Sequence, residues 1–104
     1  MGFKRDEIID EFSKLIKKNY PDSKIILFGS RARGDNLKDS DYDFVIISNN
    51  FKSLKTPKRL ELVYDLWPDY KYNADILPYT QEEFNVQSKM LTITKKAKEE
   101  GIII

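Results

Sequence analysis

The sequence contains no cysteine and no histidine among its 104 residues. These absences exclude disulfide bonds, thiolate nucleophiles, zinc sites built on cysteine or histidine, and acid–base catalysis by imidazole. Any catalytic chemistry would therefore have to rest on carboxylates, hydroxyl groups, lysine or arginine. The metal ions that suit such side chains are hard cations such as Mg²⁺, which prefer oxygen ligands.

Long apolar runs and a strong charge imbalance are also missing. The apolar runs are only a few residues long, so no signal peptide, membrane span or other membrane contact is expected, and a cytoplasmic location is the plain interpretation. The net charge of +1 gives no general attraction to nucleic acid, so direct nucleic-acid binding is not expected. With 40% hydrophobic and 34% charged residues, the chain is expected to fold as one domain over residues 1–104.

Apolar periodicity and turn-forming residues predict a series of helices and strands. Helical spacing of apolar residues indicates a helix, and short runs rich in β-branched and aromatic residues indicate buried strands. The predicted helices cover residues 6–19, 56–67, a short segment after Thr80, and about 89–100, and the predicted strands cover residues 24–29, 41–48 and 71–79. The isoleucines at 102–104 form either an edge strand or a contact surface. This order predicts an α+β fold (two-layer α/β), with helices packed on a small mixed sheet.

Three helix ends carry specific signals. Thr56 is expected to cap its helix, because Pro57 would then occupy the first helical position. Thr80 and Glu83 have the spacing of a capping box, in which each side chain bonds the backbone N–H of the other residue. Gly101 is expected to end the last helix.

Three aspartates lie on the predicted strands. Asp41 and Asp43 belong to one strand, where alternation puts both side chains on the same face as Val45. Asp75 lies on a neighbouring strand and is placed to add a third carboxylate to that face. Clustered like charges repel unless a cation or arginines neutralise them, and three such carboxylates are what two-metal nucleotidyl transfer requires. The alternative is that these aspartates only cap turns or accept hydrogen bonds.

A phosphate-binding turn is expected directly after the first strand. Gly29 lets the backbone approach a ligand closely, and Ser30 supplies a hydroxyl and a backbone N–H for phosphate oxygens. Arg31 and Arg33 add positive charge for the same phosphates. The alternative is that the arginines form surface salt bridges with nearby loop aspartates, and such pairs contribute little.

The spacing between the turn and the aspartates is more specific than either feature alone. In the stretch "LFGSRARGDNLKDSDYDFVI" (27–46), ten residues separate Gly29-Ser30 from the triplet Asp41-Tyr42-Asp43. This pattern resembles the hallmark of the polymerase-beta-like nucleotidyltransferase superfamily. Within it, the chain looks most like the minimal nucleotidyltransferases, and the resemblance covers nearly its whole length.

The resemblance implies a metal-dependent catalytic site with that superfamily's fold. Asp41 and Asp43 would ligate both metals of a two-metal Mg²⁺ site, in which Mn²⁺ is an alternative. Asp75 would bind the catalytic metal and help to deprotonate the acceptor hydroxyl.

The same resemblance implies a nucleoside triphosphate substrate, with ATP the expected one. Gly29 and Ser30 would hold its β- and γ-phosphates, and Arg31 or Arg33 would support them. No second domain follows the sheet in this sequence, so acceptor choice is expected to come from a partner or from an oligomer of the chain.

The resemblance further implies an antitoxin. Minimal nucleotidyltransferases of this kind are commonly one half of a two-component system whose partner is a HEPN-type ribonuclease, which they silence by adenylylating a tyrosine. The predicted function is therefore transfer of AMP from ATP to a hydroxyl of a partner protein. Two alternatives stay open: a non-catalytic module that binds nucleotide or neutralises its partner by association, and a metal-free structural domain.

Overall fold

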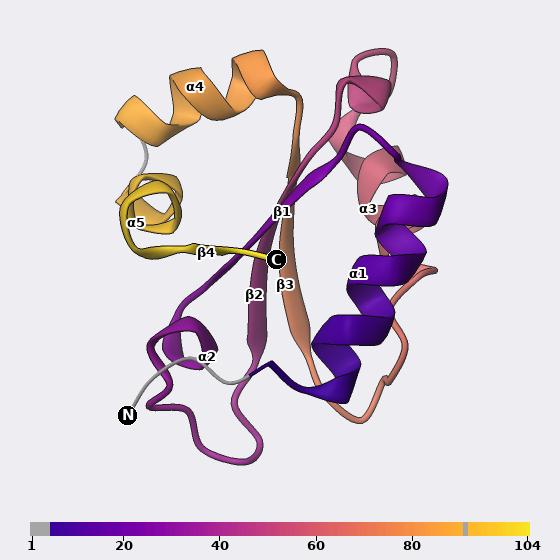
Figure 1. Cartoon of the computed structure of the whole chain (residues 1–104). Coiled ribbons are helices and arrows are strands. Elements are labelled where there is room, and N and C mark those ends of the chain that lie inside the picture. Colours follow the sequence, from indigo (N-terminus) through magenta and orange to yellow (C-terminus); the bar gives the residue numbers. More distant parts are fainter. Residues whose placement is uncertain (1–4, 91) are drawn as a thin grey trace.

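The computed structural model of this chain describes residues 5–90 and 92–104. Within them, four strands form one mixed sheet in the order β3-β2-β1-β4, with helices on both of its faces (Figure 1). This arrangement confirms the predicted α+β fold. The elements are α1 (Glu7–Asn19), β1 (Lys24–Phe28), α2 (Ser30–Arg33), β2 (Tyr42–Ile47), the 3₁₀ helix η1 (Asn49–Phe51), α3 (Thr56–Tyr64), β3 (Ala74–Tyr79), α4 (Gln81–Met90), α5 (Thr92–Glu100) and β4 (Ile102–Ile103).

The register of the sheet brings distant parts of the chain together at one end. Strands β2 and β3 run parallel, and their pairing places Asp43 beside Asp75. Strands β1 and β2 run antiparallel, and Phe28 pairs with Asp43. Gly29, which follows Phe28 in the chain, therefore lies next to the start of β2.

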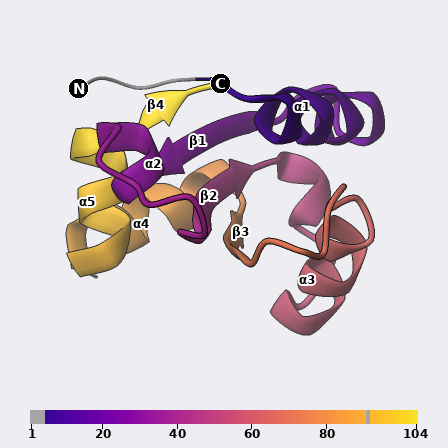
Figure 2. The ribbon, with the colours of Figure 1, turned by 90° about the horizontal axis from the view of Figure 1, so that it is seen from below.

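Two hydrophobic layers hold the helices on the sheet. Helices α1 and α3 lie on one side of the sheet, and α4 and α5 lie on the other (Figure 2). Along β2 the side chains alternate between the layers, so that Phe44 joins the α1 side while Val45 joins the α4/α5 side. Asp43 therefore faces the α4/α5 side, as the alternation predicted. The buried members of the α1 side include Ile9, Phe12, Ile16, Ile25, Leu27, Tyr42, Phe44, Ile46, Val63 and Trp67, and those of the other side are Ile26, Phe28, Val45, Ile47, Phe84 and Ala97.

The helix expected over 56–67 differs at both ends from the prediction. Thr56 is its first helical residue, and the preceding Lys55 takes the N-cap position without a capping side-chain bond. The helix ends at Tyr64, with Asp65 as its C-cap, because the N–H groups after Asp65 bond only three residues back, from Leu66 to Val63 and from Trp67 to Tyr64. The prediction of Thr56 as the cap was therefore wrong by one residue.

The C-terminal third follows the prediction more closely. The capping box is confirmed, with the Glu83 N–H donating to Thr80 Oγ1 at 3.2 Å and the Thr80 N–H donating to Glu83 Oε1 at 2.8 Å. The last helix begins at Thr92 rather than near residue 89, and it ends before Gly101 as expected. Of the two possibilities for the isoleucine tail, the edge strand is observed, with Ile102 and Ile103 paired to β1.

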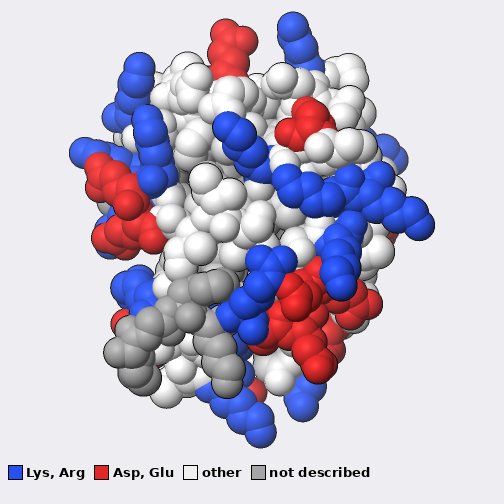
Figure 3. All heavy atoms as spheres, viewed as in Figure 1, with Lys and Arg blue, Asp and Glu red and all other residues white. Residues whose placement is uncertain are grey.

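Two further observations concern the surface charge and the length of the helices. On the face seen in Figure 3, positive and negative side chains are interspersed, in keeping with the net charge of +1. In the part of the chain that the structure describes, none of the helices has both the length and the apolar character needed to cross a bilayer.

Candidate active site

Asp43 and Asp75 form the centre of the site. They occupy matching positions on two neighbouring parallel strands, where side chains on the same face lie side by side. Asp43 is half-buried, whereas Asp75 and Asp41 are exposed. Burial, and then the negative charges of Asp75 and Asp41, raise the pKa of the Asp43 carboxyl to about 6. The structure thus places Asp43 and Asp75 side by side, whereas Asp41 lies just before β2 and not on it as predicted.

Gly29 brings the phosphate-binding turn against this cluster. Its φ of +74° lies in the left-handed region that favours glycine. A Cβ at this position would collide with Oδ2 of Asp43 and would lie 3.2 Å from its Cγ. The Asp43 carboxylate thus lies directly over the backbone of the turn, and a side chain at position 29 would displace it.

The two arginines of the turn lie in different environments. Arg31 is buried, and its guanidinium donates to the carbonyl of Ser40 at 2.8 Å and 3.0 Å and to that of Lys38 at 3.1 Å. It also lies 3.8 Å from the centre of the Tyr42 ring. Through these contacts, Arg31 holds the loop before β2 in place.

Arg33 is exposed and lies beside the carboxylates. It pairs with Asp35 at 3.1 Å, as the salt-bridge alternative expected, and its charge partly offsets the rise in the pKa of Asp43. Ser30 is half-buried and is the first residue of α2. The structure therefore places Gly29 and Arg33 at the candidate site, with Ser30 next to Gly29 in the chain.

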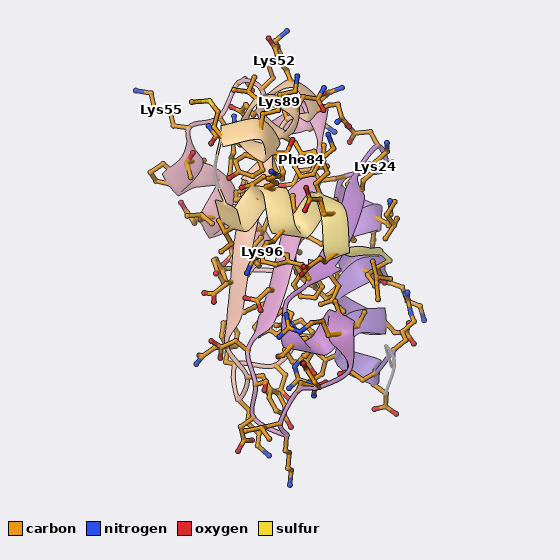
Figure 4. All side chains as sticks on the ribbon, turned by 90° about the vertical axis from the view of Figure 1, so that its left-hand side faces the viewer. Lys24, Lys52, Lys55, Phe84, Lys89 and Lys96 are labelled. Carbon is orange, nitrogen blue, oxygen red and sulfur yellow. The ribbon has the colours of Figure 1, made fainter. Side chains whose placement is uncertain are left out.

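A cavity of about 190 Å³ joins these groups to the C-terminal helix. Phe28, Gly29, Arg33 and Asp43 line it on the sheet side, and α5 lines it on the other. The lining residues from α5 are Ile93, Lys96 and Glu100. In Figure 4, which looks onto α4 and α5, Lys96 extends from α5 across the strands.

Sequence reasoning did not identify the α5 residues of this cavity. The helix was predicted, but helical periodicity gives the relative directions of its side chains and not the part of the sheet on which the helix packs. The only sequence signal is that Ile93, Lys96 and Glu100 share one helical stripe.

A larger hollow of about 450 Å³ lies on the α1 side of the sheet. Its polar groups bond to one another: the Tyr42 hydroxyl donates to the Asp6 carboxylate at 2.6 Å, and Arg31 lies 3.8 Å from the same carboxylate. Because Asp43, the carboxyl group with the raised pKa, lines the smaller cavity, the candidate site is placed there.

The donor set at this site is suited to a hard divalent cation. Its groups are carboxylate oxygens, and the crowding that raises the pKa of Asp43 is the kind that a cation relieves. Within residues 5–90 and 92–104, no three acidic side chains are oriented so that they hold one ion together. Asp41 and Asp75 are both exposed, so their side chains are accessible from solvent.

Three proteins of Methanocaldococcus jannaschii resemble this chain in sequence, and each is named "putative protein adenylyltransferase". MJ1379 is 31% identical over 99 residues, which cover 93% of this chain and 90% of that protein. MJ0141 is 38% identical over 73 residues, or 68% of this chain and 71% of that protein. MJ1305 is 30% identical over 90 residues, which cover 83% of this chain, and the match spans only 60% of the length of MJ1305.

Solved structures resemble the fold. The crystal structure of a "putative nucleotidyltransferase" from Sulfolobus solfataricus superposes with a TM-score of 0.56 at 19% identity, over 96% of this chain and 87% of that one. A second crystal structure, also of a "putative nucleotidyltransferase", gives a TM-score of 0.56 at 23% identity, over 78% of this chain and 87% of that one. At these identities the likeness supports the fold alone.

The family model described as "Nucleotidyltransferase domain" matches residues 9–104, a range that contains the Gly29 turn and all three aspartates. This match agrees with the resemblance predicted from the spacing of Gly29-Ser30 and Asp41-Tyr42-Asp43. The chain belongs to the nucleotidyltransferase domain family.

Proposed function

We propose that this chain transfers AMP from ATP to a hydroxyl group of a partner protein. The observation that carries the proposal is the Asp43 carboxylate, which lies against the Gly29 turn and beside Asp75. One point of the sheet thus combines a turn that a phosphate group can approach with the carboxylates that phosphoryl transfer uses. The names of the M. jannaschii relatives support a protein as the acceptor.

The proposed reaction uses each group at the site in a separate way. Gly29 and Ser30 hold the terminal phosphates, and Arg33 neutralises part of their charge. The acceptor oxygen attacks the α-phosphorus, the bond from that phosphorus to the bridging oxygen breaks, and pyrophosphate leaves. Asp75, which is exposed and therefore accessible to a bound protein, takes the proton of the hydroxyl group.

Mg²⁺, or Mn²⁺ in its place, is the proposed cofactor. Asp41, Asp43 and Asp75 would hold it, and it would supply the positive charge that the triphosphate and the leaving pyrophosphate need. Asp43 is the central ligand in this proposal, because it is the half-buried carboxylate between the other two.

The proposed partner is a HEPN-type ribonuclease, for which the chain would act as an antitoxin. The support is the family membership together with the resemblance to minimal nucleotidyltransferases. A non-catalytic module that neutralises its partner by association is the second candidate. The orientation of the acidic side chains, which do not converge on one ion in the described residues, favours that candidate.

One labelling experiment separates the two candidates. The protein is incubated with ATP labelled on its α-phosphate, Mg²⁺ and the protein encoded by the adjacent gene. Label should appear on the partner with the wild type and with Asp39→Ala, a loop aspartate outside the cavity. It should be absent with the Asp41→Ala, Asp43→Ala double variant. If the double variant neutralises the partner as well as the wild type does, and no label moves, association alone accounts for the function.

A further inference from the structure

The cavity at the candidate site has two walls that come from segments far apart in the sequence. Gly29, Arg33 and Asp43 form the wall on the sheet side. Helix α5 forms the other wall, through Ile93, Lys96 and Glu100. The sheet side is the part that the proposed function already uses, whereas nothing in that proposal assigns a role to α5.

The position of α5 is fixed by small buried residues rather than by the residues that face the cavity. Thr94 and Ala97 are fully buried at 0% exposure, on the stripe that packs against the sheet. At the end of the helix, a Cβ on Gly101 would collide with the side chain of Ile26 on β1. The close packing of this stripe turns the neighbouring stripe of α5, which carries Lys96, toward the Gly29 turn.

Lys96 is available to bind an anion at this position. It is exposed, and among residues 5–90 and 92–104 it takes part in none of the ion pairs. It lines the same cavity as Arg33, so that two cations from two elements border one space. A triphosphate carries several negative charges, and such a pair favours it over a monophosphate.

The remaining residues of the α5 wall suit the other parts of a nucleotide. Ile93 has 53% of its surface exposed, which leaves an apolar contact for a ribose or a base. Glu100 is an acceptor that repels phosphate and suits ribose hydroxyl groups. Of the lining residues, Arg33 and Lys96 are the ones whose charge suits the phosphates.

We propose that α5 is the second wall of the nucleotide site, with Lys96 binding the triphosphate opposite Arg33 and Ile93 contacting the nucleoside. This inference rests on the proposed function and extends it, because it assigns nucleotide recognition to the last helix of this domain.

Equilibrium binding of ATP and of AMP in the presence of Mg²⁺ tests the role of Lys96. Lys96→Ala should weaken ATP binding about tenfold and AMP binding less than about twofold, since a charged contact to the outer phosphates is lost. Lys96→Arg should retain ATP binding within about threefold. The matched control is Lys95→Ala, an exposed lysine of the same helix that does not line the cavity, which should bind both nucleotides as the wild type does.

Ile93→Ser tests the apolar contact in the same assay. It should weaken ATP and AMP binding equally, by about threefold, because both nucleotides carry the nucleoside. Equal ATP binding by Lys96→Ala and Lys95→Ala would overturn the assignment of Lys96 and leave the proposed function standing. Absence of ATP binding by the wild type would overturn the proposed function and this inference together.

Discussion

At the scale of single residues, Asp43 differs from the other aspartates in how far it is withdrawn from water. It is half-buried beneath the Gly29 turn, and its pKa is raised to about 6 by burial and by two neighbouring carboxylates. A carboxyl group in this setting destabilises the folded state when it is ionised and no cation neutralises it. Its position is therefore understandable as a binding position for positive charge rather than as part of the packing.

The raised pKa predicts a pH dependence of stability in the absence of divalent cations. The folded state keeps the Asp43 proton at pH values where the unfolded chain, with a pKa near 3.8, has released it. The contribution of Asp43 to the free energy of unfolding should therefore fall as the pH rises from about 4 through about 6, by roughly 1 kcal/mol once solvent screening is allowed for. Urea unfolding across this range measures the effect.

Two changes should remove that pH dependence. Asp43→Asn takes away the titrating group, and Mg²⁺ at neutral pH should restore stability to the wild type by neutralising the charged carboxylate. Asp39→Asn is the control and should keep the wild-type slope. An unchanged slope in Asp43→Asn would contradict the account of this residue.

Gly29 gives a second prediction at the residue scale, and Gly34 supplies its matched control. Both glycines have a positive φ, of +74° and +82°, so an alanine at either one strains the backbone by about 1 kcal/mol. Only Gly29→Ala should also displace the Asp43 carboxylate and abolish ATP binding. Urea unfolding and ATP binding, measured for both variants, separate the two effects, and ATP binding retained by Gly29→Ala would contradict the close approach.

At the scale of elements, the attachment of α3 to the sheet depends on a buried arginine. Arg59 of α3 is 5% exposed and donates to the carbonyls of Leu54 at 2.8 Å and Pro78 at 3.2 Å. It also pairs with Glu83, and this hydrogen bonding is the main cause that lowers the pKa of the Glu83 carboxyl. One side chain thus connects α3, the edge strand β3 and the start of α4.

Arg59→Ala should lower the free energy of unfolding by about 3 kcal/mol, because it leaves buried carbonyls and a carboxylate without their partner. Lys58→Ala is the matched control. Lys58 pairs with Glu61 at 3.5 Å on the exposed side of the same helix, and its loss should change stability by less than about 1 kcal/mol. Urea unfolding of both variants measures the difference, and similar values would contradict the structural role of Arg59.

The elements also show what the sequence could and could not predict. The alternation of side chains along strands and the helical spacing of apolar residues predicted the order of the elements. They also predicted that Asp43 lies on the same face as Val45, because both features depend on local geometry. The caps at Thr80 and Glu83 were predicted for the same reason. The burial of Arg31 and Arg59 was not foreseen, since their partners are carbonyls whose positions depend on the tertiary fold.

At the scale of the whole molecule, the hydrophobic layers on the two faces of the sheet have different roles. The α1 side carries the larger apolar cluster and most of the aromatic residues, so it supplies the stability of the fold. The α4/α5 side is smaller and leaves one end of the sheet open at the Gly29 turn. The motif spacing predicted the turn and the aspartates of this site. It did not predict the α5 wall, because that depends on how a helix distant in the sequence packs on β1.

The central claim is that this arrangement transfers AMP, and the intact mass of the partner protein tests it most directly. After incubation with ATP, Mg²⁺ and the wild-type protein, the partner should gain the mass of an adenylyl group, with one pyrophosphate released for each group added. Asp43→Asn should give no gain, and Asp39→Asn should give the wild-type gain. A partner that is neutralised by the wild type without any gain in mass, or that gains the same mass with Asp43→Asn, would contradict the account.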